Sequence, residues 1–337
     1  MRNGERIVHR VGQINGQSAF PIYQDLGVGV FQQILSWSDI ATTRPANPTD
    51  PNDPAYNWPP QIDYDIQQAE AHNMQVLLMP MNTPPWANGG QPPRLTPTDP
   101  TDYANFVTAA AKRYPQVKHW MIWGEPCSAR NYQPITIQPI GKPLTPAQKL
   151  QPQSYAVLLD DAYGALKAVS PSNIVIGGDS WSVCDIRPLE WVKYLKLPDG
   201  RRPRMDLYGH NPFTFFSKRA TPPRYGIMDF PALPRLQAAI NRYLEPATGK
   251  AIHLWLSEFT LPTGRDTEFN FHYSEARQAQ LIRSTFAEAR RLHTASYGWI
   301  FLEDTPAGNP PDDRHRGGLL RADGSKKPGY AVFKREH

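Results

Sequence analysis

The segment HWMIWGEP, residues 119–126, carries the pattern that decides the fold: a short apolar run that leads directly into a glutamate, Glu125. Its residues are apolar on consecutive positions, as in a strand that is buried on both faces. A carboxylate at the end of such a strand is costly to bury unless it serves a function. The same pattern returns in IHLWLSE, residues 252–258, which ends in Glu258.

Comparable apolar runs recur along the chain and alternate with segments of helical periodicity. Such helical segments include DPTDYANFVTAAAKRY, residues 99–114, and the segment that begins at Ser274, which is a typical N-cap residue. Eight strands are expected, at residues 7–12, 28–35, 75–81, 119–125, 173–178, 205–210, 252–258 and 295–302. Alternating strands and helices give a parallel sheet, and eight such units fit a closed barrel. The sequence therefore predicts an α/β fold, a (β/α)₈ TIM barrel, with residues 1–337 forming a single domain.

An open dinucleotide-binding sheet is the rival architecture. The segment GVGVFQ, residues 27–32, has Gly27 and Gly29, but Gln32 stands where the third glycine of the fingerprint belongs. A continued strand follows this segment, whereas the fingerprint requires a helix. We therefore favour the barrel.

Composition and charge limit the kinds of partner. The chain is 40% hydrophobic and 20% charged, as globular proteins are, and its net charge of +5 is scattered along the sequence. It lacks the Lys/Arg block that is typical of nucleic-acid binding. Apolar stretches such as residues 74–81 fall far short of the roughly 20 residues that span a bilayer. We expect no nucleic-acid partner and no membrane span.

The two cysteines, Cys127 and Cys184, follow the fourth and fifth expected strands, which are neighbours in a barrel. Their loops could meet, so the cysteines either form a disulfide or remain two free thiols. A disulfide would brace the loop after Glu125 and would indicate an oxidising compartment. The polar N-terminal segment shows no signal peptide. An extracellular protein whose leader has been removed is slightly favoured over a cytoplasmic one.

Glu125 and Glu258 end the fourth and seventh expected strands, and chemistry in such barrels sits at the C-terminal ends of the strands. Glycoside hydrolysis requires two carboxylates across a cleft. One donates a proton to the leaving oxygen, and the other attacks the anomeric carbon or activates water. Aromatic neighbours such as Trp123 and Trp255 would raise the pKa of the proton donor.

Further polar and aromatic residues at the strand ends are candidates for binding a carbohydrate substrate. Aromatic rings stack on the apolar CH faces of sugars, and Trp299 is the preferred stacking residue. Structural roles remain open for several candidates, including a core position for His210. The candidates are Asn82, Trp86, Trp123, Asp179, Trp181, His210, Asn211 and Trp299.

Five segments, in the right order, resemble the clan A glycoside hydrolases, which are retaining (β/α)₈ glycosidases of cellulase-like and xylosidase-like families. IWGEP resembles their strand-four motif W-N-E-P, and WLSEF resembles their strand-seven motif. The other three segments are LLMPMNTPPWA (77–87), YGHNPF (208–213) and GGLLRADGSKKPGYAVFK (317–334). The resemblance implies that Glu125 is the general acid/base, that Glu258 is the nucleophile, and that neither a metal nor a cofactor is needed.

The sequence departs from that family pattern in three places. Gly124 stands where most members have an asparagine that binds the sugar 2-hydroxyl, and Phe213 stands where a tyrosine often supports the nucleophile. Gln32 and Gln33 stand where an arginine is often found. A carbohydrate-binding barrel without catalysis and a transglycosylating enzyme therefore remain alternatives. A metal-dependent barrel hydrolase is disfavoured, because the nine histidines form no H-x-H or H-E-x-x-H motif.

The long proline-rich segments 41–60 and 133–152 follow the second and fourth expected strands. Long ordered loops in compact domains are often functional. We therefore expect both segments to form walls of the cleft.

Overall fold

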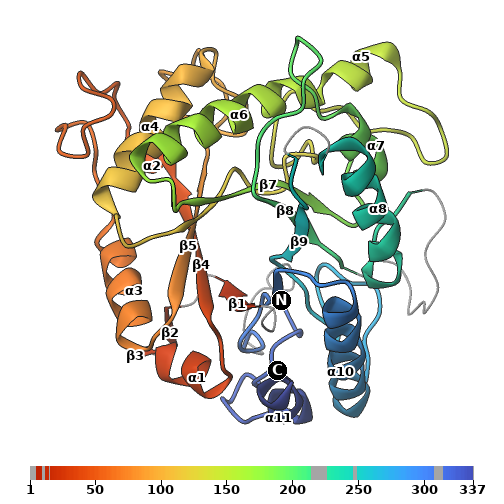
Figure 1. Ribbon diagram of the computed structural model, residues 1–337. Helices are drawn as coiled ribbons and strands as arrows, with labels where there is room; N and C mark the ends of the chain where they lie inside the picture. Colours follow the sequence, from red (N-terminus) through yellow and green to blue (C-terminus); the bar gives the residue numbers. More distant parts are fainter. Residues whose placement is uncertain are drawn as a thin grey trace.

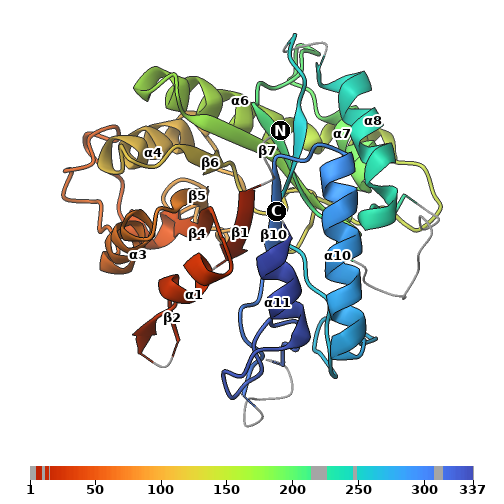
Figure 2. The same ribbon diagram turned by 60° about the horizontal axis from the view of Figure 1, so that its bottom comes forward.

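The computed structural model of the protein describes residues 5–9, 12–14, 16–213, 226–245, 249–306 and 314–336, with only the backbone for residues 5–9. Eight parallel strands close into a barrel in the order β1-β10-β9-β8-β7-β6-β5-β4 (Figures 1 and 2). They are β1 (Glu5–His9), β4 (Val30–Ser36), β5 (Gln75–Met81), β6 (His119–Met121), β7 (Ile174–Trp181), β8 (Leu207–Asn211), β9 (His253–Leu256) and β10 (Ser296–Trp299). The predicted (β/α)₈ barrel is confirmed, whereas its description as one domain over residues 1–337 stays a prediction.

Helices surround the barrel and follow its strands, as Figure 1 shows. The predicted N-cap Ser274 is present and accepts a hydrogen bond from the backbone N–H of Arg277. Asp99 caps another helix in the same way and accepts one from that of Thr101. The helices are α1 (Phe20–Asp25), α2 (Trp37–Ile40), α3 (Pro60–Ala71), α4 (Pro100–Arg113), α5 (Pro146–Leu150), α6 (Pro152–Val169), α7 (Pro188–Tyr194), η1 (Phe230–Ala232), α8 (Leu233–Tyr243), α10 (Glu275–Arg291) and α11 (Pro328–Arg335). A small hairpin, β2 (Gln13–Ile14) and β3 (Gln17–Ser18), precedes α1. No helix in the described ranges has the length and hydropathy that a membrane crossing requires.

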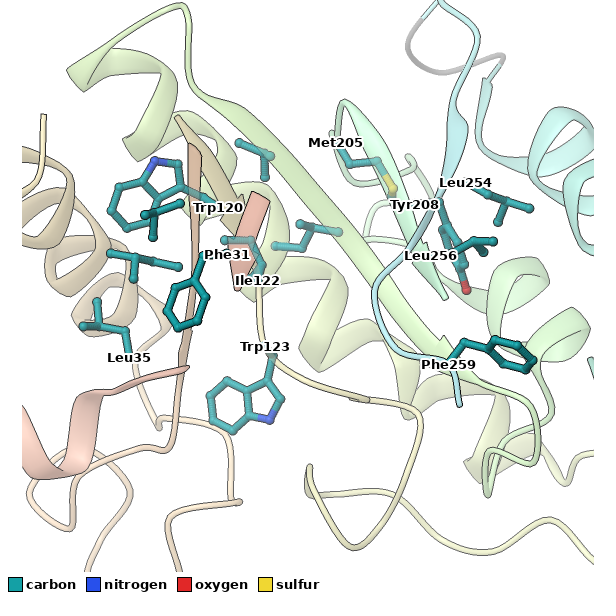
Figure 3. Close-up of a cluster of buried hydrophobic side chains, with 14 of the residues drawn as sticks. Phe31, Leu35, Trp120, Ile122, Trp123, Met205, Tyr208, Leu254, Leu256 and Phe259 are labelled. Carbon is teal, nitrogen blue, oxygen red and sulfur yellow. The ribbon is translucent and has the colours of Figure 1, made fainter. Parts of the chain in front are cut away.

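Consecutive strand residues enter two separate cores, which explains the continuous apolar runs. The larger core lies between strands and helices, and Figure 3 shows part of it, including Phe31, Leu35 and Trp120. The smaller core fills the barrel interior and consists of Val30, Leu77, Met79, Met121, Ile176 and Trp255. Because side chains alternate along a strand, each buried strand must be apolar on both faces.

Two strands differ from their predicted bounds at the rim where the functional residues lie. The expected strand 119–125 is shorter in the structure, because Trp123 and Glu125 adopt positive φ values of 65° and 46°, which a strand cannot contain. The expected strand 173–178 instead continues to Trp181 as β7. The remaining strands lie within a few residues of their expected positions. Of the expected strand 7–12, residues 10 and 11 lie outside the described residues.

Candidate active site

A pocket of about 590 Å³ opens above the barrel interior, and both glutamates line it. Met79 and Met81, from β5, belong to its wall and also contact the interior core. The pocket therefore lies at the C-terminal ends of the strands, as the fold requires for a barrel enzyme. The other residues that line it are Gly124, Ser128, Arg130, Asn131, Asp179, Trp181, Phe213, Thr267, Glu268, Ile300 and His315.

The carboxylate of Glu125 is held by two asparagine amides, one on each oxygen. Asn211 Nδ2 lies 3.0 Å from Oε1, and Asn131 Nδ2 lies 2.9 Å from Oε2. The backbone N–H of Glu125 donates to Asp179 Oδ2 at 3.1 Å. A positive φ at a non-glycine residue is uncommon and tends to occur where function constrains the backbone. Glu125 is thus fixed at both its backbone and its side chain.

Asn211, the last residue of β8, connects the two glutamates. Its Nδ2 donates to the carboxylate of Glu125, while its Oδ1 accepts from the backbone N–H of Glu258 at 3.1 Å. The hydroxyl of Ser257 lies 2.7 Å from the same Oδ1. Because Asn211 is completely buried and does not line the pocket, it is not placed to contact a sugar.

Asp179 reaches the pocket because β7 contains a bulge. The pairing with β8 shifts between Gly177 and Ser180, so that Gly178 and Asp179 together face Gly209. A Cβ on Gly209 would lie 2.9 Å from Asp179 Cα, so this position has no room for a side chain. Bulges of this kind redirect side chains next to active sites. Burial raises the pKa of Asp179 to about 6, although hydrogen bonds from Glu125 N–H and Ser257 act in the opposite direction.

The pKa of Glu125 lies well above its ordinary range. Burial is the main cause, and the negative charge of Glu258 is the second. The hydrogen bond from Asn211 partly opposes this rise. A carboxyl group that stays protonated beside an ionised one can donate a proton, while its neighbour remains available for nucleophilic attack.

Gly124 packs closely against two methionine side chains. A Cβ at this position would lie 3.2 Å from the sulfur of Met79 and 3.7 Å from that of Met81. The wall next to Glu125 is therefore a backbone and two thioethers, which donate no hydrogen bonds. An amide side chain at position 124 would require Met79 to move.

The structure brings only part of the predicted substrate-binding set into the pocket. Asp179 and Trp181 line it. Asn82, Trp86, Trp123, His210, Asn211 and Trp299 lie outside its lining.

Two of the tryptophans outside the pocket lining are held by contacts within the fold. The indole N–H of Trp86 donates to the carbonyl of Ala41, and the guanidinium of Arg44 lies 4.5 Å above its ring. The indole N–H of Trp123 donates to the carbonyl of Asn131 at 2.9 Å, and its ring is completely buried. Trp123 therefore supports the residue that binds Glu125, but offers no surface to a ligand.

His210 and Trp299 are both completely buried, which separates them from a substrate in the pocket. His210 is completely buried, with Nδ1 2.9 Å from Ser180 Oγ and Nε2 2.8 Å from the carbonyl of Met228. Burial lowers its pKa to about 4. Trp299 is also completely buried and packs edge-on against Phe259 on the helix side of β10. We do not retain either residue as a sugar contact.

Asn82 lies at the end of β5 with a positive φ of 69°, and its side-chain amide donates to the hydroxyl of Ser36 at 3.3 Å. It is partly exposed but outside the pocket. A direct contact with a sugar is therefore not retained for Asn82 either.

Several residues of the site had not been identified from the sequence. Asn131 lies six positions after Glu125 and returns to it through a turn, for which no sequence motif exists. Ile300, rather than Trp299, points inward, and the alternation of side chains along a strand is the signal that could have indicated it. Phe213, by contrast, is one of the departures from the family pattern that the sequence shows; it lines the pocket and packs against Phe269, 5.9 Å away between ring centroids.

Cys127 and Cys184 form a disulfide, with their Cα atoms 5.4 Å apart. It connects the loop after Glu125 to the segment after β7. The segments 41–60 and 133–152 are ordered and described throughout, but neither contributes a residue to the lining of this pocket. Within the described residues, no three His, Cys, Asp or Glu side chains are grouped so that they could hold a metal ion.

The chain matches no protein-family model and no curated protein. Its fold is similar to many solved structures. One is a family 39 glycoside hydrolase from the gut symbiont Bacteroides cellulosilyticus WH2, at a TM-score of 0.67 and 19% identity, covering 98% of this chain and 62% of that chain. A monomeric β-xylosidase from Caulobacter crescentus CB15 matches at a TM-score of 0.64 and 17% identity, over 99% and 67% of the two chains.

The structure of XacCel5A matches over nearly its whole length, at a TM-score of 0.59 and 12% identity, covering 100% of this chain and 98% of that chain. The chain spans less than two thirds of the family 39 enzyme. Identities this low show the fold alone. The protein is therefore structurally similar to clan A glycoside hydrolases of the family 39 and Cel5A types.

Proposed function

We propose that the protein is a glycoside hydrolase that cleaves O-glycosidic bonds by double displacement. Glu125 acts as the general acid/base and Glu258 as the nucleophile. The observation that carries the proposal is the pairing of these carboxylates in one pocket, linked through Asn211, with the pKa of Glu125 raised by burial and by Glu258. The substrate class is a carbohydrate, and the particular sugar and linkage are left open.

In the first step, the carboxylate of Glu258 attacks the anomeric carbon while Glu125 donates its proton to the leaving oxygen. A glycosyl ester forms on Glu258, and the charge of that carboxylate disappears. The pKa of Glu125 then falls, because one of the two causes that raised it is removed. Glu125 can therefore accept a proton from water in the second step, which releases a product with retained configuration.

The decisive test combines variants of both glutamates with product analysis. Glu258→Ala should lower kcat by about 10⁴-fold or more, and azide should restore turnover with an inverted glycosyl azide as product. Glu125→Ala should retain glycosylation of aryl glycosides with good leaving groups and lose activity on poor ones. Glu70→Ala, an exposed position on α3, is the matched control and should leave turnover unchanged.

The result that contradicts the proposal is wild-type turnover in either glutamate variant on a natural glycoside. The alternatives give separate outcomes in the same assays. A binding protein without catalysis would bind sugars equally well before and after Glu258→Ala and would turn over none. A transglycosylating enzyme would transfer the sugar to added alcohols or saccharides in preference to water.

A further inference from the structure

We infer that Asn131 is a positioning residue for Glu125, and that the disulfide-linked loop which follows Glu125 holds Asn131 in place. The inference rests on the proposed function only for its kinetic readout. It concerns the state of one carboxyl group, and this can be measured without any substrate.

Asn131 is attached to the neighbourhood of Glu125 at both its side chain and its backbone. Its Nδ2 donates to Glu125 Oε2 at 2.9 Å, and its carbonyl accepts from the indole N–H of Trp123 at 2.9 Å. Its own N–H donates to the carbonyl of Ser128 at 3.1 Å, which closes the turn. Trp123 is completely buried, so it provides a rigid reference point two residues before the glutamate.

Three links connect the loop that carries Asn131 to the segment 184–186, which follows β7. Cys127 is joined to Cys184 by the disulfide. The carbonyl of Cys127 accepts from the N–H of Ile186 at 3.2 Å, and the N–H of Ala129 donates to Asp185 Oδ2 at 2.8 Å. All three links fall between Glu125 and Asn131, so losing them frees the turn that returns Asn131 to the carboxylate.

The charges around Glu125 determine the direction of the effect. Glu258, Asp179 and Glu268 are the carboxylates whose negative charge acts on it. Arg130 and His315 line the same pocket. In this acidic setting an amide donor stabilises the ionised form of Glu125, because its N–H dipole points at the carboxylate oxygen. Removing the donor should leave the proton bound to a higher pH.

The experiment is a carboxyl NMR titration of protein labelled with ¹³C-glutamate, in which Glu125→Gln identifies the resonance of Glu125. Asn131→Ala should raise the pKa of Glu125 by about one pH unit. Asn131→Asp should raise it further, because it also adds a negative charge. Thr136→Ala, farther along the same segment, is the control and should leave the titration unchanged.

The route through the loop is tested by Cys127→Ser with Cys184→Ser. This variant should raise the pKa of Glu125 in the wild-type background and add nothing in the Asn131→Ala background. If it does not fold, Asp185→Ala removes one link while keeping the disulfide, and it should give a smaller rise. An unchanged pKa in Asn131→Ala overturns the positioning role, and a fully additive cysteine effect overturns the route through Asn131.

Activity separates this inference from the proposed function. In an active glycosidase, the basic limb of the pH profile of kcat/KM should move upward in Asn131→Ala together with the NMR value. If the wild-type protein cleaves no glycoside but the titration still shifts, the proposed function is wrong and the positioning role stands. If the protein is an active retaining glycosidase and the titration does not shift, the proposed function stands and the positioning role of Asn131 is wrong.

Discussion

Among single residues, Asp179 is a buried carboxyl group whose protonation should affect stability. Burial raises its pKa to about 6, from an ordinary value of 3.8. An acid whose pKa is higher in the folded state stabilises the fold at low pH and loses that contribution as pH rises. The loss should fall between about pH 4 and pH 6 and amount to about 3 kcal/mol at pH 7.

Asp179→Asn should therefore make the protein more stable than the wild type at pH 7, by up to about 3 kcal/mol, and about equal to it below pH 4. The asparagine can satisfy both neighbours: its oxygen accepts from Glu125 N–H, and its nitrogen donates to Ser257, whose own hydrogen goes to Asn211. Urea denaturation across this pH range measures the difference. An equal gain at every pH would mean that ionisation is not its cause.

Single residues also show where sequence reasoning about the site reaches its limit. Glu125 and Glu258 could be placed on one rim because strand ends meet there in a parallel barrel. The sequence does not show that Trp299 points away from the pocket, because this depends on which alternate residues of β10 face the barrel interior. Gly298 and Ile300 face inward, and a Cβ on Gly298 would lie within 1.9 Å of the carbonyl oxygen of Ser257. The role of Asn131 depends on a turn that no local pattern encodes.

Among the elements, the helices were predictable because their signals are local. The pattern SEARQAQ indicated a start at Ser274, and α10 begins at the next residue with the Ser274 hydroxyl accepting from Arg277 N–H at 3.2 Å. The bulge in β7 was not predictable, because it arises from pairing with Gly209 on a different strand. Backbone pairing of this kind involves residues that are distant in the sequence.

Ser274→Ala should destabilise the protein by about 1 kcal/mol, because it leaves a backbone N–H at the start of α10 without its acceptor. Ser284→Ala is the matched control on the same helix, where the exposed hydroxyl only bonds back to the carbonyl of Leu281. It should be neutral or slightly stabilising, since alanine is the better helix former. Urea denaturation of both variants makes the comparison, and equal losses would contradict the capping role.

At the scale of the whole molecule, a buried ion pair joins the segment that leads into α11 to the loop after β10. Lys327 Nζ lies 2.7 Å from Asp304 Oδ1, and the two side chains are only 1% and 8% exposed. The same ammonium donates to the hydroxyl of Thr263 at 2.7 Å. The sequence GGLLRADGSKKPGY is part of one of the segments that resemble the clan A enzymes, but nothing in it distinguishes the buried Lys327 from the adjacent Lys326, which is 61% exposed.

This difference in burial gives a prediction for two neighbouring lysines. Lys327→Ala leaves the carboxylate of Asp304 buried without its cation, and should lower the free energy of unfolding by about 3–5 kcal/mol. Lys326→Ala removes an exposed pair with Asp25 at 3.4 Å and a contact of the ammonium with the ring of Tyr330 at 4.2 Å, and should cost less than about 1 kcal/mol. Urea denaturation at neutral pH gives both values. Adding Asp304→Asn to Lys327→Ala should recover part of the loss, because the stranded charge is then removed. If the two lysine variants were equally stable, α11 would be held to the barrel by its apolar contacts with α10 rather than by the buried ion pair.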